Sequence, residues 1–451
     1  MAELNLRAGK KAKASTAYAA ACTYLSAGIA LLDRGDWDSR YRLVFDLWLL
    51  RAECEFLRGD FDEAARLNSE LIKRAASKTD KAAAYRLRID FHIMKSAYHE
   101  AVDNALECLS LFGIDMPAQP SWERVNDEFE QVWRNLGARS IESLVDLPQM
   151  TDPEIQAATS VLSRLYEVAF FTDKNLFLLS TCHIVNLSLK YGTIDASAHG
   201  YASFGNILGR AFHRYADAYR FGELGIDLAE KLGSATYKAR VYMNMAWIAI
   251  WTKPVTTSLD FVRAAFSAAL ETGDVIFACY CCDHTVTDLL ARGDHLDEVW
   301  RESERCLDFV RKAKSRDYLD RIVSQQQFIQ TMREPTAISS SPEGTHLDQA
   351  GFDAQVTGDR AAVCWYWILR LQTEFLMADY ESAISAAQKA KPLLWAATGC
   401  IQLLDYHYYT ALAIAAAIKT APPERQQEWS ETLFAHVEQL REWAKNCAPI
   451  F

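Results

Sequence analysis

Cysteine and histidine side chains gather most densely in one short segment, Cys279-Tyr280-Cys281-Cys282-Asp283-His284. On a helix, Cys279 and Cys282 share one face, while Cys281 and His284 share another. Neither face offers the four ligands of a structural zinc site, and no second Cys/His pair has zinc spacing. We interpret the segment as a buried helix face and predict that it binds no metal.

Three further patterns resemble catalytic motifs but lack essential members. Gly9-Lys10-Lys11 would end a phosphate-binding loop only with glycine at position 4 and serine or threonine at position 11, where the chain has Leu4 and Lys11. Glu343-Gly344-Thr345-His346 is a single Glu-x-x-His motif, whereas di-iron bundles need two. His99-Glu100 lacks the downstream proline of a phosphoacceptor histidine. We therefore predict no catalytic, cofactor-binding or metal-binding residues, and no enzyme.

Two other motifs have structural explanations. Arg58-Gly59-Asp60 and Arg292-Gly293-Asp294 match an adhesion tripeptide, but both fall where a turn joins two predicted helices. Gly205 and Gly209 lie four residues apart inside a helical segment without a preceding strand, which favours close helix packing over nucleotide binding.

Composition and periodicity predict the elements that must hold these residues. The 451 residues include only 19 glycines and 11 prolines, and half of them are hydrophobic. The spacing of Tyr215, Ala218, Tyr219, Gly222, Gly225, Ile226, Ala229 and Leu232 is that of one helical stripe. No comparable stretch alternates as a strand does, so the fold class is predicted to be all-α.

The helices form pairs marked by a recurring signature: a turn, an aromatic residue or leucine, and a small or branched apolar residue three positions on. It occurs at residues 58–64, 97–101, 215–218, 292–299 and 379–383. Glycine ends one helix, aspartate caps the next, and a small residue such as Ala64 or Ala101 allows close approach. We predict a right-handed superhelical solenoid of eight or nine degenerate tetratricopeptide-like (TPR-like) hairpins.

Turn-forming residues interrupt this array in two places. Residues 113–153 contain four prolines around a helical piece at about 121–137, and residues 337–344 form the stretch poorest in hydrophobic residues. We predict a helical array over 1–333, a surface loop over 334–358 and a continuation over 359–451. Pro392 is expected to end or kink its helix.

Bulk charge limits the partners. The net charge of −11 opposes nucleic-acid binding. The longest apolar stretches have about eleven residues, half of what a membrane span needs. The N-terminus is charged where a signal peptide would be apolar, and eleven cysteines without regular spacing fit a reducing compartment. We expect a cytoplasmic protein.

Several segments resemble the long helical region of bacterial multi-sensor signalling multikinases. The likeness is carried by residues 8–18, 52–55, 59–61, 113–117, 200–202 and 443–447. The family joins a serine/threonine-kinase-like domain, an AAA-type ATPase, this helical region, a GAF sensor and often a histidine kinase. Its catalytic motifs belong to the flanking domains, so the resemblance implies a role in signalling without assigning a site residue.

Two functions follow from this interpretation. The first is a non-catalytic regulatory segment that binds a protein partner, neighbouring kinase, ATPase or sensor domains, or a second copy of itself. The alternative is a ligand-sensing solenoid that encloses a small molecule. Aromatic residues that would line such a cavity are Trp247, Trp251, Tyr280, Trp365 and Tyr366.

The C-terminal helix is expected to form an open array edge. Trp429, Leu433, Val437 and Leu440 make one stripe that packs on the preceding helix. Phe434, Ile450 and Phe451 would remain partly uncovered, as in a fragment of a longer array or a surface for self-association.

Overall fold

A computed structural model describes residues 1–95, 97–333, 360–397 and 399–446. The all-α prediction is confirmed: these ranges contain twenty-one α-helices and three short 3₁₀ helices. Their only extended pairing is one isolated parallel bridge between Gln149 and Thr193. The predicted loop at 334–358, the Glu343–His346 motif and the tail residues Ile450 and Phe451 lie outside the described residues.

The chain divides into two compact units. One comprises Met1–Arg139 and Asp146–Gly200, and the other Ser140–Val145 and Tyr201–Phe451. The helices of the first are α1 (Ala2–Ala14), α2 (Tyr18–Ala30), α3 (Asp36–Ser39), α4 (Tyr41–Leu57), α5 (Phe61–Arg74), α6 (Lys78–Met94), α7 (Tyr98–Ser110), α8 (Trp122–Leu136), α9 (Pro153–Thr172) and α10 (Lys174–Tyr191). Helix α8 is the helical piece expected between the prolines.

The division falls within α11 (Asp195–Phe212), and a 3₁₀ helix at Glu142–Asp146 lies at the other boundary. The second unit continues with α12 (Tyr215–Leu232), α13 (Ala235–Ala249), α14 (Val255–Thr272), α15 (Val275–Arg292), α16 (Leu296–Lys312), α17 (Arg316–Arg333), α19 (Arg360–Leu376), α20 (Tyr380–Ala390), α21 (Gln402–Ala417) and α22 (Pro423–Asn446). Helix α20 ends just before Pro392, as predicted, and a 3₁₀ helix follows at Lys391–Ala397.

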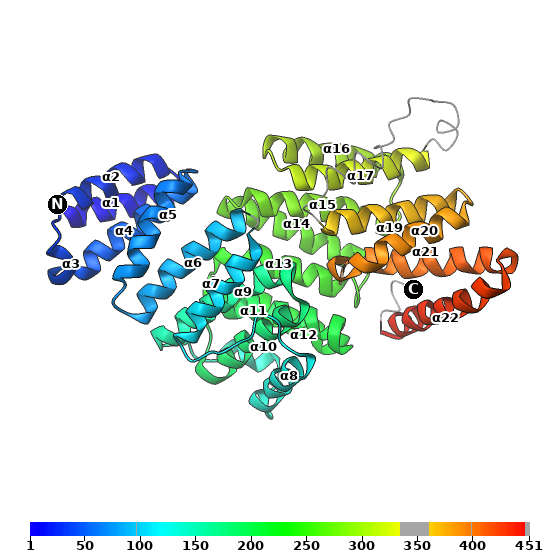
Figure 1. The fold of residues 1–451 in the computed structure, drawn as a ribbon, viewed down its shortest axis with the longest axis horizontal. Coiled ribbons are helices and arrows are strands. Elements are labelled where there is room, and N and C mark those ends of the chain that lie inside the picture. Colours follow the sequence, from blue (N-terminus) through cyan, green and yellow to red (C-terminus); the bar gives the residue numbers. More distant parts are fainter. Residues whose placement is uncertain (96, 334–359, 398, 447–451) are drawn as a thin grey trace. The chain divides into compact units, whose positions relative to one another are not determined.

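Consecutive helices pack as hairpins (Figure 1). Within the described ranges, nine such pairs are α1–α2, α4–α5, α6–α7, α9–α10, α11–α12, α13–α14, α15–α16, α19–α20 and α21–α22. This number agrees with the predicted eight or nine hairpins. Each hairpin also contacts a neighbour, for example α2 with α4 and α14 with α15, so its buried face is completed by the next pair.

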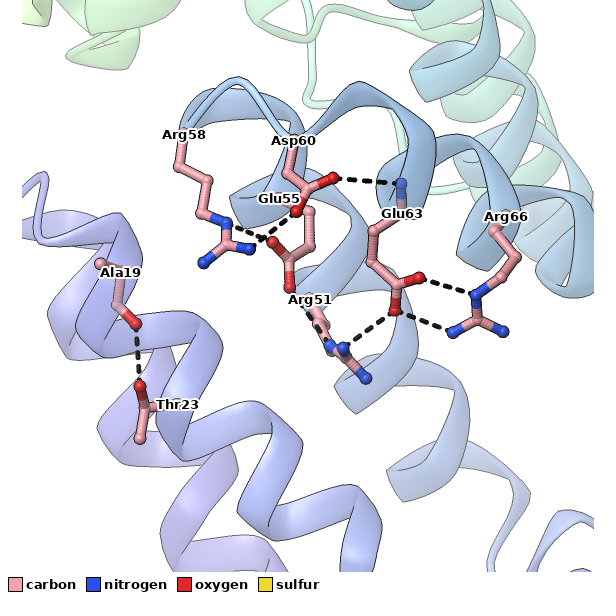
Figure 2. Close-up of polar contacts among 8 residues, drawn as sticks. All are labelled: Ala19, Thr23, Arg51, Glu55, Arg58, Asp60, Glu63 and Arg66. Carbon is pink, nitrogen blue, oxygen red and sulfur yellow. Dashed lines mark hydrogen bonds and ion pairs between the residues drawn. The ribbon is translucent and has the colours of Figure 1, made fainter.

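The turn between α4 and α5 has the geometry that its sequence predicts (Figure 2). Gly59 adopts a φ of +90°, and the Asp60 carboxylate accepts a hydrogen bond from the Glu63 backbone N–H. Arg58 donates to Asp60 at 2.9 Å and also pairs with Glu55, which is almost fully buried on α4. The Arg-Gly-Asp tripeptide is therefore a helix-reversing turn held by its own two charges.

A left-handed residue recurs two positions before a helix begins. Glycine occupies it at Gly59, Gly233 and Gly273, but Thr16, His213, Lys314 and Ala378 adopt the same positive φ with a side chain. For a residue with a Cβ this conformation costs about 1–2 kcal/mol. The hairpin geometry thus imposes left-handed backbone even where the sequence does not supply glycine.

The predicted caps are only partly correct. Asp60 and Asp379 cap α5 and α20 as expected. Asp294, however, does not cap α16: the cap is His295, whose Nδ1 accepts from the Asp297 N–H. Asp294 instead pairs with Arg292, repeating the Arg58–Asp60 contact. Pairing with the arginine does not by itself prevent capping, because Asp60 does both; α16 begins one residue later than the signature predicts, at Leu296, so His295 occupies the cap position.

Helices α11 and α12 approach closely at a glycine. A Cβ on Gly205 would lie 2.6 Å from the Ala218 carbonyl oxygen and 3.0 Å from the Gly222 nitrogen. At Gly209 the nearest atom would be a ring carbon of Tyr215, at 3.2 Å. The interpretation of these two glycines as helix-packing residues is confirmed, and Ala64 and Ala101 are likewise fully buried in their hairpins.

Helix α22 packs on α21, and three of the four residues of the predicted stripe, Trp429, Leu433 and Leu440, take part in hydrophobic clusters. Trp429 and Trp443 are buried, Leu433 and Leu440 join the hydrophobic clusters around them, and Phe434 remains 64% exposed. No helix in the described part of the chain is both long and apolar enough to cross a membrane.

We predict that Gly205→Ala lowers the free energy of unfolding by about 1–3 kcal/mol, because the added methyl group meets the backbone of α12 rather than a movable side chain. Gly209→Ala should lower the free energy of unfolding by less, because the Tyr215 side chain can shift by a few tenths of an ångström. Urea denaturation of both variants checks the order. Equal stability of Gly205→Ala and the unmodified protein would contradict the close approach.

Replacing Ala378 by glycine should have the opposite effect. Ala378 is exposed and has a φ of +61°, so Ala378→Gly should raise stability by about 0.5–1 kcal/mol. Ala415→Gly, at an exposed position inside α21, is the matched control and should lower stability by about the same amount. If both glycine variants lose stability, Ala378 is not strained.

Candidate functional site

A cavity of about 270 Å³ lies among α15, α17, α19 and α21 and the turn that follows α15. These elements all belong to the second unit, where α15 contacts α17, α17 contacts α19 and α19 contacts α21 (Figure 1). Its polar walls include Thr287, Arg321, Gln325, Gln402, Asp405 and Tyr409. Its apolar walls include Leu290, Phe328, Met332, Trp365, Tyr366 and Leu369.

Helical periodicity places these side chains on shared faces. On α17, Arg321 and Gln325 are one turn apart, and Phe328 and Met332 continue the same stripe. On α21, Gln402 and Asp405 are separated by three residues and so project from one side. Each helix therefore presents polar residues at one end of a face that is otherwise apolar.

Asp283 on α15 holds the polar wall together. It is completely buried, and its carboxylate lies 3.3 Å from the Arg321 guanidinium and accepts a 2.9 Å hydrogen bond from the Gln325 amide. The buried charge is tolerated because both a cation and a neutral donor reach it. The result is a fixed α15–α17 contact beside the cavity.

Thr287 extends this network to α21. Its hydroxyl oxygen accepts hydrogen bonds from Gln325 Nε2 at 2.9 Å and from Gln402 Nε2 at 3.3 Å. Through this hydroxyl, Thr287 contacts a residue of α21 that lies 115 positions later in sequence. The two glutamine amides consequently lie on the same side of the cavity.

Aromatic rings support Arg321 from behind. The guanidinium carbon lies 4.7 Å from the centroid of the Trp365 ring, and Trp365 packs edge-on against the buried His284. Burial, assisted by the positive charge of Arg321, lowers the pKa of His284 to about 3. His284 is therefore neutral at ordinary pH and is part of the apolar support.

Two carboxyl groups near the cavity have strongly raised pKa values. Burial raises the pKa of Asp405 to about 7, and it does the same for Asp288 although Ser258 donates a 2.7 Å hydrogen bond to it. Asp405 borders the cavity and has no hydrogen bond or ion pair with another described side chain, whereas Asp288 points away toward α14. Asp405 is therefore a half-buried carboxyl group that faces open space.

Only two of the five aromatic residues proposed from sequence line the cavity, namely Trp365 and Tyr366. Tyr280 and Trp247 pack against His284, with ring centroids at 4.6 and 5.8 Å. Trp251 lies elsewhere, where its indole N–H donates to the Gly399 carbonyl at 2.8 Å and its ring packs on Trp443.

The cysteine-rich segment is core. Cys279 and Cys282 pack in one hydrophobic cluster and Cys281 in another, and burial raises the pKa of the Cys279 thiol to about 11. Across the described residues, no three His, Cys, Asp or Glu side chains are arranged to hold a metal ion. The expected absence of metal stays a prediction.

Four residues of the cavity wall were not predicted from the sequence as site residues: Arg321, Gln325, Gln402 and Asp405. Each is a polar residue on a helix face that is otherwise buried, and this exception to the apolar pattern was the available signal. This signal does not indicate which helices are neighbours. The four residues form one site only because α17 and α21 both contact α15.

Comparisons with known proteins place the chain near signalling proteins. It is 21% identical over 358 residues to "Hybrid signal transduction histidine kinase G" from Dictyostelium discoideum. The match covers 73% of this chain and 10% of that protein, so the chain spans about a tenth of its relative's length. No protein-family model matches the chain.

Two solved structures are similar at low scores. One is described as Naa15/Naa10 bound to HypK-THB, with a TM-score of 0.24, 10% identity and coverage of 95% of this chain and 88% of that one. The other, a circular tandem repeat protein, has a TM-score of 0.12, 11% identity and coverage of 99% and 96%. Similarities at this level carry no argument about function.

The raised pKa of Asp405 predicts a pH-dependent effect of Asp405→Asn. Between about pH 4 and 7 the folded protein keeps a proton that the unfolded chain releases, so this carboxyl group destabilises increasingly as pH rises and fully above pH 7. The variant should gain stability relative to the unmodified protein by on the order of 2 kcal/mol more at pH 8 than at pH 5.

Asp294→Asn is the matched control for this measurement by urea denaturation. Arg292 lowers the pKa of Asp294, so its ionised form stabilises the fold and its removal should give no gain at pH 8. A pH-independent effect of Asp405→Asn would show that partial burial does not raise the pKa of Asp405.

Proposed function

We propose that the chain is a non-catalytic regulatory segment of a signal-transduction ATPase or kinase and that it acts through protein–protein contact. The observation that carries the proposal is the extended similarity to a signalling histidine kinase, which involves most of this chain but a tenth of that protein. The stacked hairpins support it, because helical-repeat arrays present long surfaces to partner domains. Membership of the bacterial multikinase group and a cytoplasmic location belong to the same proposal.

The non-catalytic part of the proposal rests on chemistry. Gly9 is buried in the middle of α1, where a Cβ would lie 2.7 Å from Leu25, so Gly9-Lys10-Lys11 is helix and not a phosphate-binding loop. The carboxyl groups that line the cavity are Asp294, which pairs with Arg292, and Asp405, which has no partner among the described side chains. Phosphoryl transfer needs metal-holding carboxylates together with a phosphate cradle.

A second function, ligand sensing, is favoured by the cavity among α15, α17, α19 and α21. It combines apolar and aromatic walls with a few fixed polar groups, which is the composition of small-molecule sites. The two functions are compatible, since a bound ligand could alter the surface that a partner domain contacts.

We predict that the purified chain neither hydrolyses ATP nor phosphorylates itself, measured by phosphate release and by transfer of labelled phosphate. In its source cells, crosslinking followed by mass spectrometry should join the chain to kinase, ATPase, sensor or receiver domains. Phosphate release that a substitution in this chain abolishes would overturn the non-catalytic proposal. Crosslinks confined to proteins without any signalling domain would overturn the regulatory one.

A further inference from the structure

The cavity among α15, α17, α19 and α21 has more unpartnered acceptors than donors. The Oε1 atoms of Gln325 and Gln402 are buried and accept no hydrogen bond from any described residue. Both side chains are more than nine-tenths buried, at 4% and 6% exposure, and both line the cavity. The half-buried Asp405 carboxyl group on the same wall also has no donor among the described side chains. Leaving a buried acceptor such as either amide oxygen unpaired costs about 1–3 kcal/mol.

The orientation of the Gln325 amide is fixed by its neighbours. Its nitrogen lies 2.9 Å from Asp283 Oδ1, 3.2 Å from the Asp283 carbonyl oxygen and 2.9 Å from Thr287 Oγ1. Two of these are pure acceptors, so the nitrogen must occupy that position and the oxygen must be the unpartnered atom. The unpartnered oxygen of Gln325 therefore does not depend on how the amide's oxygen and nitrogen are assigned.

The charges around the cavity leave Asp405 uncompensated. Arg321 is neutralised by Asp283, and Asp294 is neutralised by Arg292. The remaining charged side chain on the wall is Asp405, on the same face of α21 as Gln402. A group that carries positive charge and several N–H donors complements this arrangement, whereas an anion would meet Asp405 without a partner.

The size of the cavity limits the ligand. Its volume of about 270 Å³ exceeds the roughly 150 Å³ that is sufficient for a benzene molecule in an apolar protein cavity. Phe328, Trp365 and Leu369 supply flat and aliphatic walls. One ring with a short polar arm fits this space.

We infer that the cavity binds a compact amine that carries one ring, with the ring against Phe328, Trp365 and Leu369 and the ammonium group donating to Asp405 and to the Oε1 atoms of Gln402 and Gln325. This rests on the second proposed function, ligand sensing, and names the chemical class of the ligand. The Trp365 indole N–H, a buried donor without a partner among the described residues, is available to an acceptor atom on the ring.

The inference is tested by calorimetric titration of the full chain at pH 8 with three probes of similar size: 2-phenylethylamine, phenylacetate and propylbenzene. The amine should bind most tightly. Asp405→Asn should weaken amine binding about tenfold or more, because one charge-assisted hydrogen bond is lost. Asp288→Asn is the matched control: Asp288 is a buried carboxyl group with a similarly raised pKa that does not line the cavity, and its replacement should leave the affinity within about twofold.

The outcomes separate the ligand class from the sensing function. If phenylacetate binds more tightly than 2-phenylethylamine, or propylbenzene binds equally tightly, the inference of an amine ligand is wrong, although the cavity is still a ligand site. Equal weakening by Asp288→Asn would show that binding does not depend on Asp405. Binding of none of the three probes would mean that only water occupies the cavity, and both the inference and the sensing function would fall, while the regulatory proposal would be unaffected. Because Asp405→Asn is expected to be more stable at pH 8, lost binding cannot be ascribed to unfolding.

Discussion

The structure depends on reversing the chain within very few residues. A helix that ends in a left-handed residue can turn back so that the next helix begins two positions later, and this geometry recurs at Thr16, Gly59, His213 and Ala378. Where the residue is not glycine, the strain must be offset by the packing of the two helices that the turn brings together. At α11 and α12 this packing is as close as backbones allow, because Gly205 has no Cβ.

Tight hairpins also explain why polar groups can be buried where pairs meet. Each helix satisfies most of its own backbone hydrogen bonds, so contacts between hairpins depend mainly on side chains. Between α15, α17 and α21 these contacts include an ion pair and shared amide bonds centred on Asp283 and Thr287. Such a network stabilises the fold only when every member has a partner, and the oxygens of Gln325 and Gln402 show that this one is incomplete.

The hairpins could be predicted from the sequence because their determinants are local. Arg58-Gly59-Asp60 contains the helix stop and the next cap within three residues, and the period of the apolar residues fixes which face is buried. Local reasoning was wrong at Asp294, because α16 begins one residue later than the signature predicts and His295 takes the cap position. The cavity could not be predicted, since Thr287 and Gln402 become neighbours only after several intervening helices have packed.

A cavity at the meeting of several hairpins has a consequence for signalling. In a stack, each pair contacts only its neighbours, so a change in one interface is passed on as a small shift of the following pairs. A ligand that bridges Asp405 on α21 and Gln325 on α17 would favour the arrangement in which both helices face the same space. Such a ligand could shift the equilibrium between two arrangements of the helices only by the difference between its affinities for them. Asp405 provides such a difference: an ammonium group stabilises its charge while it is enclosed, and opening the interface would exchange that contact for water.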